Sequence, residues 1–208
     1  MAFDPHCRRC QRLSSFLDRV AGEYSHYHAA PVAPFGDPDA RLLVVGLAPG
    51  MHGANATGRP FTGDHAGILL YETLHANGFS NQAEATAADD GLRLYDCRIT
   101  NAVKCLPPQN KPVGAEINTC NRFLSQELAE LPPSAVIVAL GAIAHQAVLK
   151  GFKLRQQAYR FAHGAEHTLP DGRRLLDSYH CSRYNTQTRR LTPKMFNQVF
   201  RRARRLLV

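Results

Sequence analysis

An α/β fold with a mostly parallel sheet, forming one domain over residues 1–208, is the fold class that the sequence predicts. Short apolar runs alternate along the chain with segments of helical periodicity, which is the pattern of strands joined by crossover helices. With 208 residues, the chain is long enough to bury one substantial core. Hydrophobic residues make up 44% of it and charged residues 20%, as in ordinary soluble globular proteins.

Three apolar runs and one hairpin are expected to supply the strands. RLLVVG enters a glycine-rich loop and is therefore interpreted as a buried parallel strand. YDCRITNAV and AVIVALG, at residues 95–103 and 135–141, are expected to form the next two strands. HTLPDGRRLLDSYH predicts a hairpin that turns at Asp171 and Gly172 and continues into a final loop from His180.

Four segments carry apolar residues at helical spacing. The first is expected to end at Gly78, the second at a Pro-Pro pair, and the third at Gly151 as its cap. The fourth begins with Thr192 as its N-cap and has proline at its first helical position. In chain order these segments are AGILLYETLHANG, EINTCNRFLSQELAEL, AIAHQAVLKG and TPKMFNQVFRRARRLL.

The charge balance is the least ordinary feature of the composition. A formal net charge of +8 favours an anionic partner such as nucleic acid, although solubility alone is an alternative explanation. No apolar run approaches the roughly 20 residues of a membrane helix, and the N-terminal residues Asp4, His6 and Cys7 do not resemble the apolar core of a signal peptide. We therefore expect a cytoplasmic protein with no membrane partner.

Four of the six cysteines have a spacing typical of metal sites. Cys7 and Cys10 form a CxxC pair, and Cys105 and Cys120 lie far downstream. Together they have the ligands for a four-thiolate site, which suits either tetrahedral zinc or a [4Fe–4S] cluster. Spacing alone does not separate these two, and scattered buried thiols are a third interpretation. Cys97, inside an expected strand, is interpreted as a small core residue.

The stretch GLAPGMHGANATGRPFTGD, residues 46–64, follows the first strand. It lacks the Lys-Ser/Thr ending of a P-loop, but it offers bare backbone amides, one aromatic side chain at Phe61 and one acid at Asp64. Asn101 ends the next expected strand, and the ends of parallel strands meet at one edge of a sheet. These residues predict a pocket for a planar ligand, in which Asp64 is either the catalyst or the N-cap of the following helix.

Three motifs and the four spaced cysteines give the chain a specific resemblance. GLAPGMHGANATGRPFTGD, ITNAVKCLPP and HCSRYNTQTRRLT closely resemble the family 5 (type B) uracil-DNA glycosylases, iron–sulfur members of the uracil-DNA glycosylase superfamily. The resemblance implies a three-layer αβα sandwich with a central, mostly parallel four-stranded sheet. It also implies a structural [4Fe–4S] cluster on Cys7, Cys10, Cys105 and Cys120.

The implied activity is that of a monofunctional DNA glycosylase. Such an enzyme flips a damaged base out of the duplex, hydrolyses its N-glycosidic bond and leaves an abasic site. Its expected partner is DNA containing uracil or other deaminated bases such as hypoxanthine and xanthine. We expect the protein to act as a monomer at the nucleoid.

The resemblance also implies a role for each motif residue. Asp64 activates the attacking water. His180 and the backbone amides near Leu47 and Ala48 stabilise the anion on the departing base. Phe61 supplies the stacking face for the flipped base.

Asn101 is expected to face the pairing edge of that base. The loop that follows the motif histidine is expected to enter the minor groove, where Arg183 or Tyr184 fills the gap left by the flipped nucleotide. Ser182 and Asn185 belong to the same DNA-binding loop.

Three positions depart from the superfamily pattern. Leu47 occupies the place where related families carry an acidic or amide side chain, so the role of that side chain falls to Asp64. Cys181 replaces a common proline, which predicts either a looser His180 loop or a thiol near DNA. Ala56 stands where a larger, often basic residue is expected.

Other classes of protein remain open from the residues alone. One is a non-catalytic lesion-sensing or nucleic-acid-binding protein with a structural four-cysteine metal site, which holds either a cluster or zinc. Another is a redox module in which the cluster carries electrons. The C-terminal arginines have two interpretations, phosphate contacts or a solvated helix face, and they are Arg201, Arg202, Arg204 and Arg205.

Overall fold

A computed structural model describes residues 3–208 and confirms the α/β fold with helices on both faces of a sheet. The sheet has the strand order β1-β3-β2-β4-β6-β5. The four central strands, β3, β2, β4 and β6, are mutually parallel, as expected. The strands are β1 (Phe35–Gly36), β2 (Leu42–Gly46), β3 (Cys97–Asn101), β4 (Val136–Leu140), β5 (Glu166–Thr168) and β6 (Arg174–Ser178).

The described sheet is wider than the four strands that were predicted. Short antiparallel strands, β1 and β5, add one edge each. The β5–β6 pair is the expected hairpin, and Gly172 in its turn has a φ of 90°. The two-residue strand β1 carries too little periodicity to be detected in the sequence.

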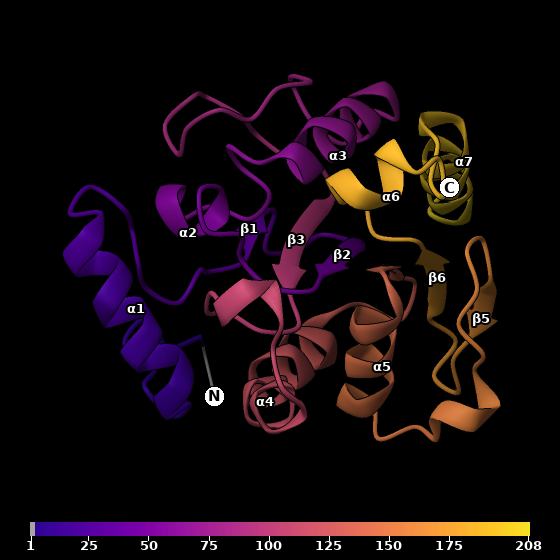
Figure 1. Cartoon of the computed structure of the whole chain (residues 1–208). Coiled ribbons are helices and arrows are strands. Elements are labelled where there is room, and N and C mark those ends of the chain that lie inside the picture. Colours follow the sequence, from indigo (N-terminus) through magenta and orange to yellow (C-terminus); the bar gives the residue numbers. More distant parts are fainter. Residues whose placement is uncertain (1–2) are drawn as a thin grey trace.

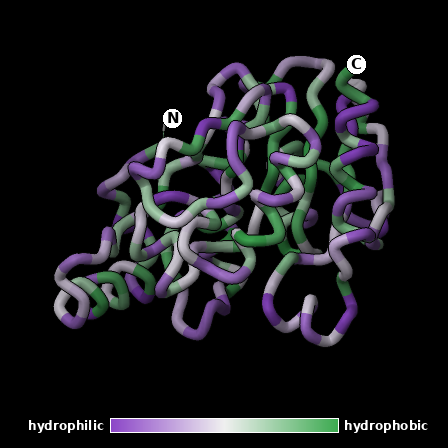
Figure 2. The backbone as a smooth tube through the Cα atoms, turned by 90° about the horizontal axis from the view of Figure 1, so that it is seen from above, coloured by the Kyte–Doolittle hydropathy of each residue, from purple (hydrophilic) through white to green (hydrophobic). Residues whose placement is uncertain are grey.

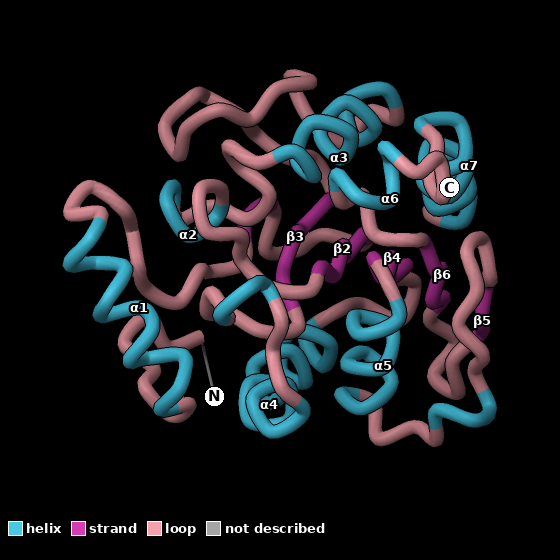
Figure 3. Tube along the Cα trace, viewed as in Figure 1, coloured by secondary structure: helices cyan, strands magenta, loops and turns pink. Residues whose placement is uncertain are grey.

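Helices cover the sheet in two layers, shown in Figures 1 and 3. On one face, α4 and α5 pack on residues such as Leu43 and Val45 of β2, while on the other face α3 and α7 pack on Leu42 and Val44. This alternation follows from the two-residue repeat of a strand. The helices are α1 (Gln11–Glu23), α2 (Ala54–Thr57), α3 (His65–Ala76), α4 (Gly114–Glu130), α5 (Ala142–Gly151), α6 (Arg183–Gln187) and α7 (Pro193–Leu206).

The ends of the predicted helices are mostly confirmed. Gly78 takes a φ of 72° just after α3, and Thr192 accepts a hydrogen bond from the Met195 amide at the start of α7. Gly151 does not cap α5 as predicted, because it is the last residue of that helix. A Cβ at Gly151 would lie 2.6 Å from Cδ1 of Leu128, so this glycine permits the close packing of α5 against α4.

Three α-helices were not predicted, and one of them, α2, is a four-residue helix inside the glycine-rich stretch. Helix α1 buries Leu13, Leu17 and Val20, which are spaced by four and three residues and were therefore detectable. Helix α6 lies within the expected final loop and is too short to show periodicity.

None of the described helices is long and apolar enough to cross a membrane, and the loops that project from the body are mostly hydrophilic (Figure 2).

Candidate active site

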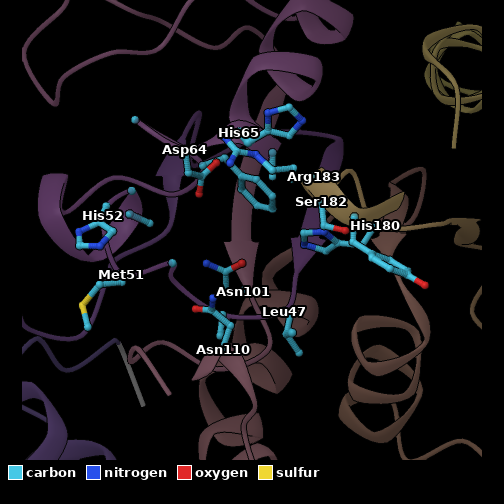
Figure 4. Close-up of a pocket in the computed structure, with 18 of the residues that line it drawn as sticks. Leu47, Met51, His52, Asp64, His65, Asn101, Asn110, His180, Ser182 and Arg183 are labelled. Atoms are coloured by element: carbon cyan, nitrogen blue, oxygen red, sulfur yellow. The ribbon is translucent and has the colours of Figure 1, made fainter. Parts of the chain in front are cut away.

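A cavity of about 820 Å³ opens where β2, β3 and β6 end (Figure 4). This position agrees with the rule that sites in open α/β sheets lie at the carboxyl ends of strands. The structure brings nearly all of the predicted catalytic, base-binding and DNA-binding residues to its wall: Leu47, Ala48, Phe61, Asp64, Asn101, His180, Ser182, Arg183 and Tyr184.

Asp64 is both the N-cap of α3 and part of the cavity wall. Its Oδ1 accepts a hydrogen bond of 2.8 Å from the Gly67 amide. A Cβ atom at Gly53 would lie 2.7 Å from the other oxygen, Oδ2. The glycine-rich loop thus lies directly against this carboxylate, and burial raises the pKa of Asp64 while the amides of Gly67 and Ala66 oppose that rise. The carboxylate has one oxygen engaged in capping and one beside the loop.

The rings of Phe61 and His180 stack in the cavity, with centroids 6.0 Å apart and planes 29° from parallel. Phe61 is buried and has a left-handed φ of 55°. A Cβ at Gly46 would lie 2.6 Å from Cζ of Phe61 and 2.3 Å from Oδ1 of Asn101. Glycine at the end of β2 therefore makes room for both side chains.

His180 follows β6 closely and is uncharged at neutral pH. Burial lowers the pKa of its imidazole to about 4, because desolvation disfavours the charged ring. The Nδ2 atom of Asn185 donates a hydrogen bond of 2.8 Å to the His180 carbonyl oxygen. Asn185 was predicted to bind DNA, but this bond engages its amide in holding the His180 loop.

Asn101 ends β3 with its side chain buried. Its Oδ1 is a buried acceptor with no hydrogen-bond partner among the described residues. Unpaired buried acceptors are rare in folded proteins, so this oxygen is suited to a ligand donor. Within residues 3–208, the amides of Leu47 and Ala48 also have no backbone acceptor.

The DNA-binding loop predicted from the sequence is partly helical. Ser182 caps α6, because its hydroxyl oxygen accepts a hydrogen bond from the backbone amide of Asn185. The Ser182 hydroxyl, which was predicted to contact DNA, therefore has a partner within the protein. Arg183 and Tyr184 are exposed at the cavity, Tyr184 to 69%. Cys181 is buried in the main core, so no thiol is presented to DNA.

Several cavity residues were not predicted from the sequence. His52 belongs to the glycine-rich motif and is held by the Tyr27 hydroxyl, 2.8 Å from its Nδ1. His65 lies 3.1 Å from Oγ1 of Thr186 and so joins the start of α3 to α6. The larger side chains among the rest are Met51, Gln109, Asn110 and Lys111, of which the last three belong to the Pro-flanked loop after β3. The sequence offered two signals for these residues: His52 and His65 are histidines within or next to the glycine-rich motif, and residues 109–111 lie in a polar loop that follows a strand end.

The four spaced cysteines line one small second cavity. Cys7 and Cys10 precede α1, Cys105 follows β3, and Cys120 lies in α4. The Lys104 amide donates to Sγ of Cys120 at 3.2 Å. Burial raises the pKa of Cys105 to about 12 and that of Cys120 to about 11. Cys97 is a buried core residue, as predicted.

Two of the C-terminal arginines are engaged within the protein. Arg202 pairs with Glu166 at 2.7 Å. Arg204 donates to the carbonyls of Asn77 and Gly78 at the end of α3, and its guanidinium lies 3.8 Å from the Phe79 ring centroid. Their structural contacts weaken the phosphate-binding interpretation for these two residues.

Comparisons with known proteins show which family the sequence is similar to. The family profile described as "Uracil DNA glycosylase superfamily" matches residues 33–204. The chain is 51% identical over 205 residues to the type-5 uracil-DNA glycosylase of Thermus thermophilus, covering 96% of this chain and 93% of the relative. It is 43% identical over 202 residues to that of Pyrobaculum aerophilum, covering 95% and 88%. A type-4 uracil-DNA glycosylase of Thermotoga maritima is 38% identical over 120 residues, covering 57% and 54%.

Proposed function

The chain belongs to the uracil-DNA glycosylase superfamily, and from this premise we propose that it removes uracil from DNA by hydrolysing the N-glycosidic bond. The observation that carries the proposal is the meeting of Asp64, Asn101 and His180 at one cavity (Figure 4). A carboxylate, an amide with an unpartnered oxygen and a neutral imidazole are the groups that this reaction needs. The base must leave the duplex before it can reach them.

Uracil recognition falls to Asn101 and Phe61. The unpartnered Oδ1 of Asn101 accepts from the N3–H of uracil, and its Nδ2 donates to O4. Phe61 offers a ring face to the flipped base. The side chain of Asn101 lies at the end of a central strand, and this rigid position suits a residue that discriminates between bases.

Cleavage breaks the bond between C1′ of the sugar and N1 of uracil, and the electron pair leaves with the base. The neutral ring of His180 and the amides of Leu47 and Ala48 supply hydrogen-bond donors for the resulting anion. Oδ2 of Asp64 accepts a proton from the water whose oxygen bonds to C1′. The same negative charge offsets the cationic character of the sugar in the transition state.

DNA contacts are assigned to the exposed rim at α6. Arg183 and Tyr184 project there from a short helix that Ser182 caps and His65 ties to α3. A net charge of +8 favours association with the phosphate backbone. One of the two exposed side chains occupies the space vacated by the flipped nucleotide.

The four-cysteine cavity fits a [4Fe–4S] cluster better than a single zinc ion. Four thiolates around one zinc lie about 3.8 Å apart, given a Zn–S bond of about 2.3 Å. In the part of the chain that is described, no three of these sulfurs lie within 4.8 Å of one another. Cys7, Cys10, Cys105 and Cys120 would hold the cluster, and the Lys104 amide donates to one sulfur as cluster ligands often require. When bound, the cluster supplies iron–thiolate bonds that tie the N-terminal arm to β3 and α4.

The proposal extends to hypoxanthine and xanthine, because 820 Å³ exceeds the space that one pyrimidine fills. It also includes action as a monomer at the nucleoid, in keeping with the positive charge and a site built from one chain. Neither extension is needed for the activity on uracil.

Strand cleavage after alkali tests the activity directly. Matched duplexes with uracil, hypoxanthine, xanthine or no lesion are incubated with the protein and then treated with alkali. We expect cleavage at uracil and none in the unmodified duplex. Tight binding of the uracil duplex without cleavage would instead identify a lesion-sensing protein.

A further inference from the structure

A second group of polar side chains lies away from the cavity, at the β5 edge of the sheet. His145 of α5, His167 of β5 and Asp177 of β6 place one ring nitrogen or carboxylate oxygen each within 4.8 Å of one another. Nδ1 of His145 is 2.7 Å from Oδ1 of Asp177, and Nε2 of His167 is 3.3 Å from Oδ2. The mechanism above uses none of the three.

The sheet register creates this group. His167 pairs with Leu175 across the hairpin, and Asp177 lies two residues further along the same strand, so both side chains point to the α5 face. Helix α5 covers that face and places His145 over them. His145 and Asp177 are fully buried, whereas 16% of the His167 side chain is exposed.

The hydrogen bonds of His145 show where the group holds its protons. Nε2 of His145 lies 2.9 Å from the Tyr159 carbonyl oxygen, which only accepts, so Nε2 carries a proton. If the ring is neutral, Nδ1 then points a lone pair at the Asp177 carboxylate. At a separation of 2.7 Å a proton lies between these two atoms, and a metal cation that binds both of them would replace that proton.

We propose that His145, His167 and Asp177 bind a divalent transition-metal ion, for which zinc is the probe. Two imidazoles and one carboxylate are ligands that zinc accepts, with a fourth position left for water. Tetrahedral bonds of about 2.05 Å place ligand atoms about 3.3 Å apart, which matches the His167–Asp177 separation of 3.3 Å. Nδ1 of His145 and Oδ1 of Asp177 are 2.7 Å apart and must separate by about 0.6 Å when the ion displaces the proton between them. The Tyr159 carbonyl supplies the outer hydrogen bond that orients a metal-bound histidine.

The surroundings of the group suit a bound ion. The rings of Phe161 and Tyr159 lie 5.6 and 5.7 Å from those of His145 and His167, respectively, and limit access by solvent. The exposed part of His167 leaves an entry path. An ion bound here would join α5 to the β5–β6 hairpin. Its ligand Asp177 lies in β6, three residues before His180, so the ion would stabilise the strand that presents the cavity histidine.

Metal content after dialysis tests the proposal. The iron-loaded protein is dialysed against zinc sulfate, and zinc and iron are counted in the same sample. We expect one zinc per chain in the wild type and in His163→Gln, a control at a histidine three residues before β5 whose ring stacks on Tyr179 outside the group. His167→Gln should bind none, with its iron content unchanged, which separates this site from the cysteines.

Thermal unfolding provides the second measurement. Zinc at about 100 times its Kd should raise the Tm of the wild type by about 5–10 °C and leave that of His167→Gln unchanged. Equal zinc in wild type and His167→Gln, at unchanged iron, would overturn the proposal and leave a proton between His145 and Asp177. Uracil excision does not enter either readout.

Discussion

Asp64 and Gly67 are joined by a hydrogen bond of 2.8 Å from the Gly67 amide to Oδ1, and this bond leaves Oδ2 of the same carboxylate beside the glycine-rich loop. Capping and catalysis are therefore not alternatives for Asp64. The cap fixes the rotamer of the acid and so positions the oxygen that handles water. A variant that keeps the cap but removes the charge separates the two roles.

Asp64→Asn should lose excision while retaining stability. Asparagine caps helices about as well as aspartate, so α3 should remain intact. It cannot accept a proton, and we expect the single-turnover rate on uracil DNA to fall by about 10²–10⁴-fold. Asp64→Ala should lose the rate and also about 1 kcal/mol of unfolding free energy in urea.

Thr192→Ala is the matched control for capping. Thr192 caps α7 through a bond of 3.2 Å from the Met195 amide and does not line the cavity. It should lose about 1 kcal/mol of stability with excision unchanged. Wild-type excision by Asp64→Asn would reduce Asp64 to a helix cap.

His180 should remain neutral at pH values where an exposed histidine is protonated. Burial lowers the pKa of its ring from 6.5 to about 4, so NMR of labelled histidine at about pH 5.5 should show a neutral ring. In the unfolded chain, the ring binds a proton below its ordinary pKa. Unfolding therefore takes up a proton between the two values, and stability falls as pH falls from 6.5 to about 4.

His180→Gln tests this assignment. The variant should show a weaker loss of stability over the same pH window, because glutamine does not titrate. Excision should also fall, since the leaving base loses a preorganised donor. A ring that titrates near its ordinary pKa in the folded protein would contradict the neutral-donor role.

Gly46→Ala should close the pocket. The added Cβ would lie 2.3 Å from Oδ1 of Asn101 and 2.6 Å from Cζ of Phe61, so the base-binding side chains must move. We expect a loss of about 10²-fold or more in excision, because small displacements of positioning groups are costly. Gly22→Ala in α1 is the control, since nothing lies within 4 Å of its Cβ. Unaltered excision by Gly46→Ala would remove these two residues from the pocket.

Arg183→Ala should weaken DNA binding in a salt-dependent manner. Its exposed guanidinium lies at the cavity rim, so its loss should reduce the slope of log affinity against log salt by about 1. Arg202→Ala should leave the slope unchanged, because that guanidinium is already paired with Glu166. Equal slopes for wild type and Arg183→Ala, measured by fluorescence anisotropy, would exclude a phosphate contact at Arg183.

The parts of the site that are local in sequence could be predicted from it. The strand ending at Gly46 and the strand ending at Asn101 each precede a motif, and parallel strands bring such ends together. The cysteine spacing likewise predicted the grouping around the second cavity. By contrast, the sequence analysis missed Gln109, Asn110 and Lys111. They lie in a loop without periodicity, so the sequence does not indicate which way their side chains point.

The sequence by itself determined the alternation of strands and helices, the edge of the sheet at which the site lies, and the residue types available there. These follow from periodicity and chain order, which are local properties. Only the tertiary structure decided that Asp64 both caps α3 and faces the loop, that His180 stacks on Phe61, and that His145 lies over His167 and Asp177. Such contacts depend on strand register and helix packing between residues far apart in the chain, where a shift of one position turns a side chain to the opposite face.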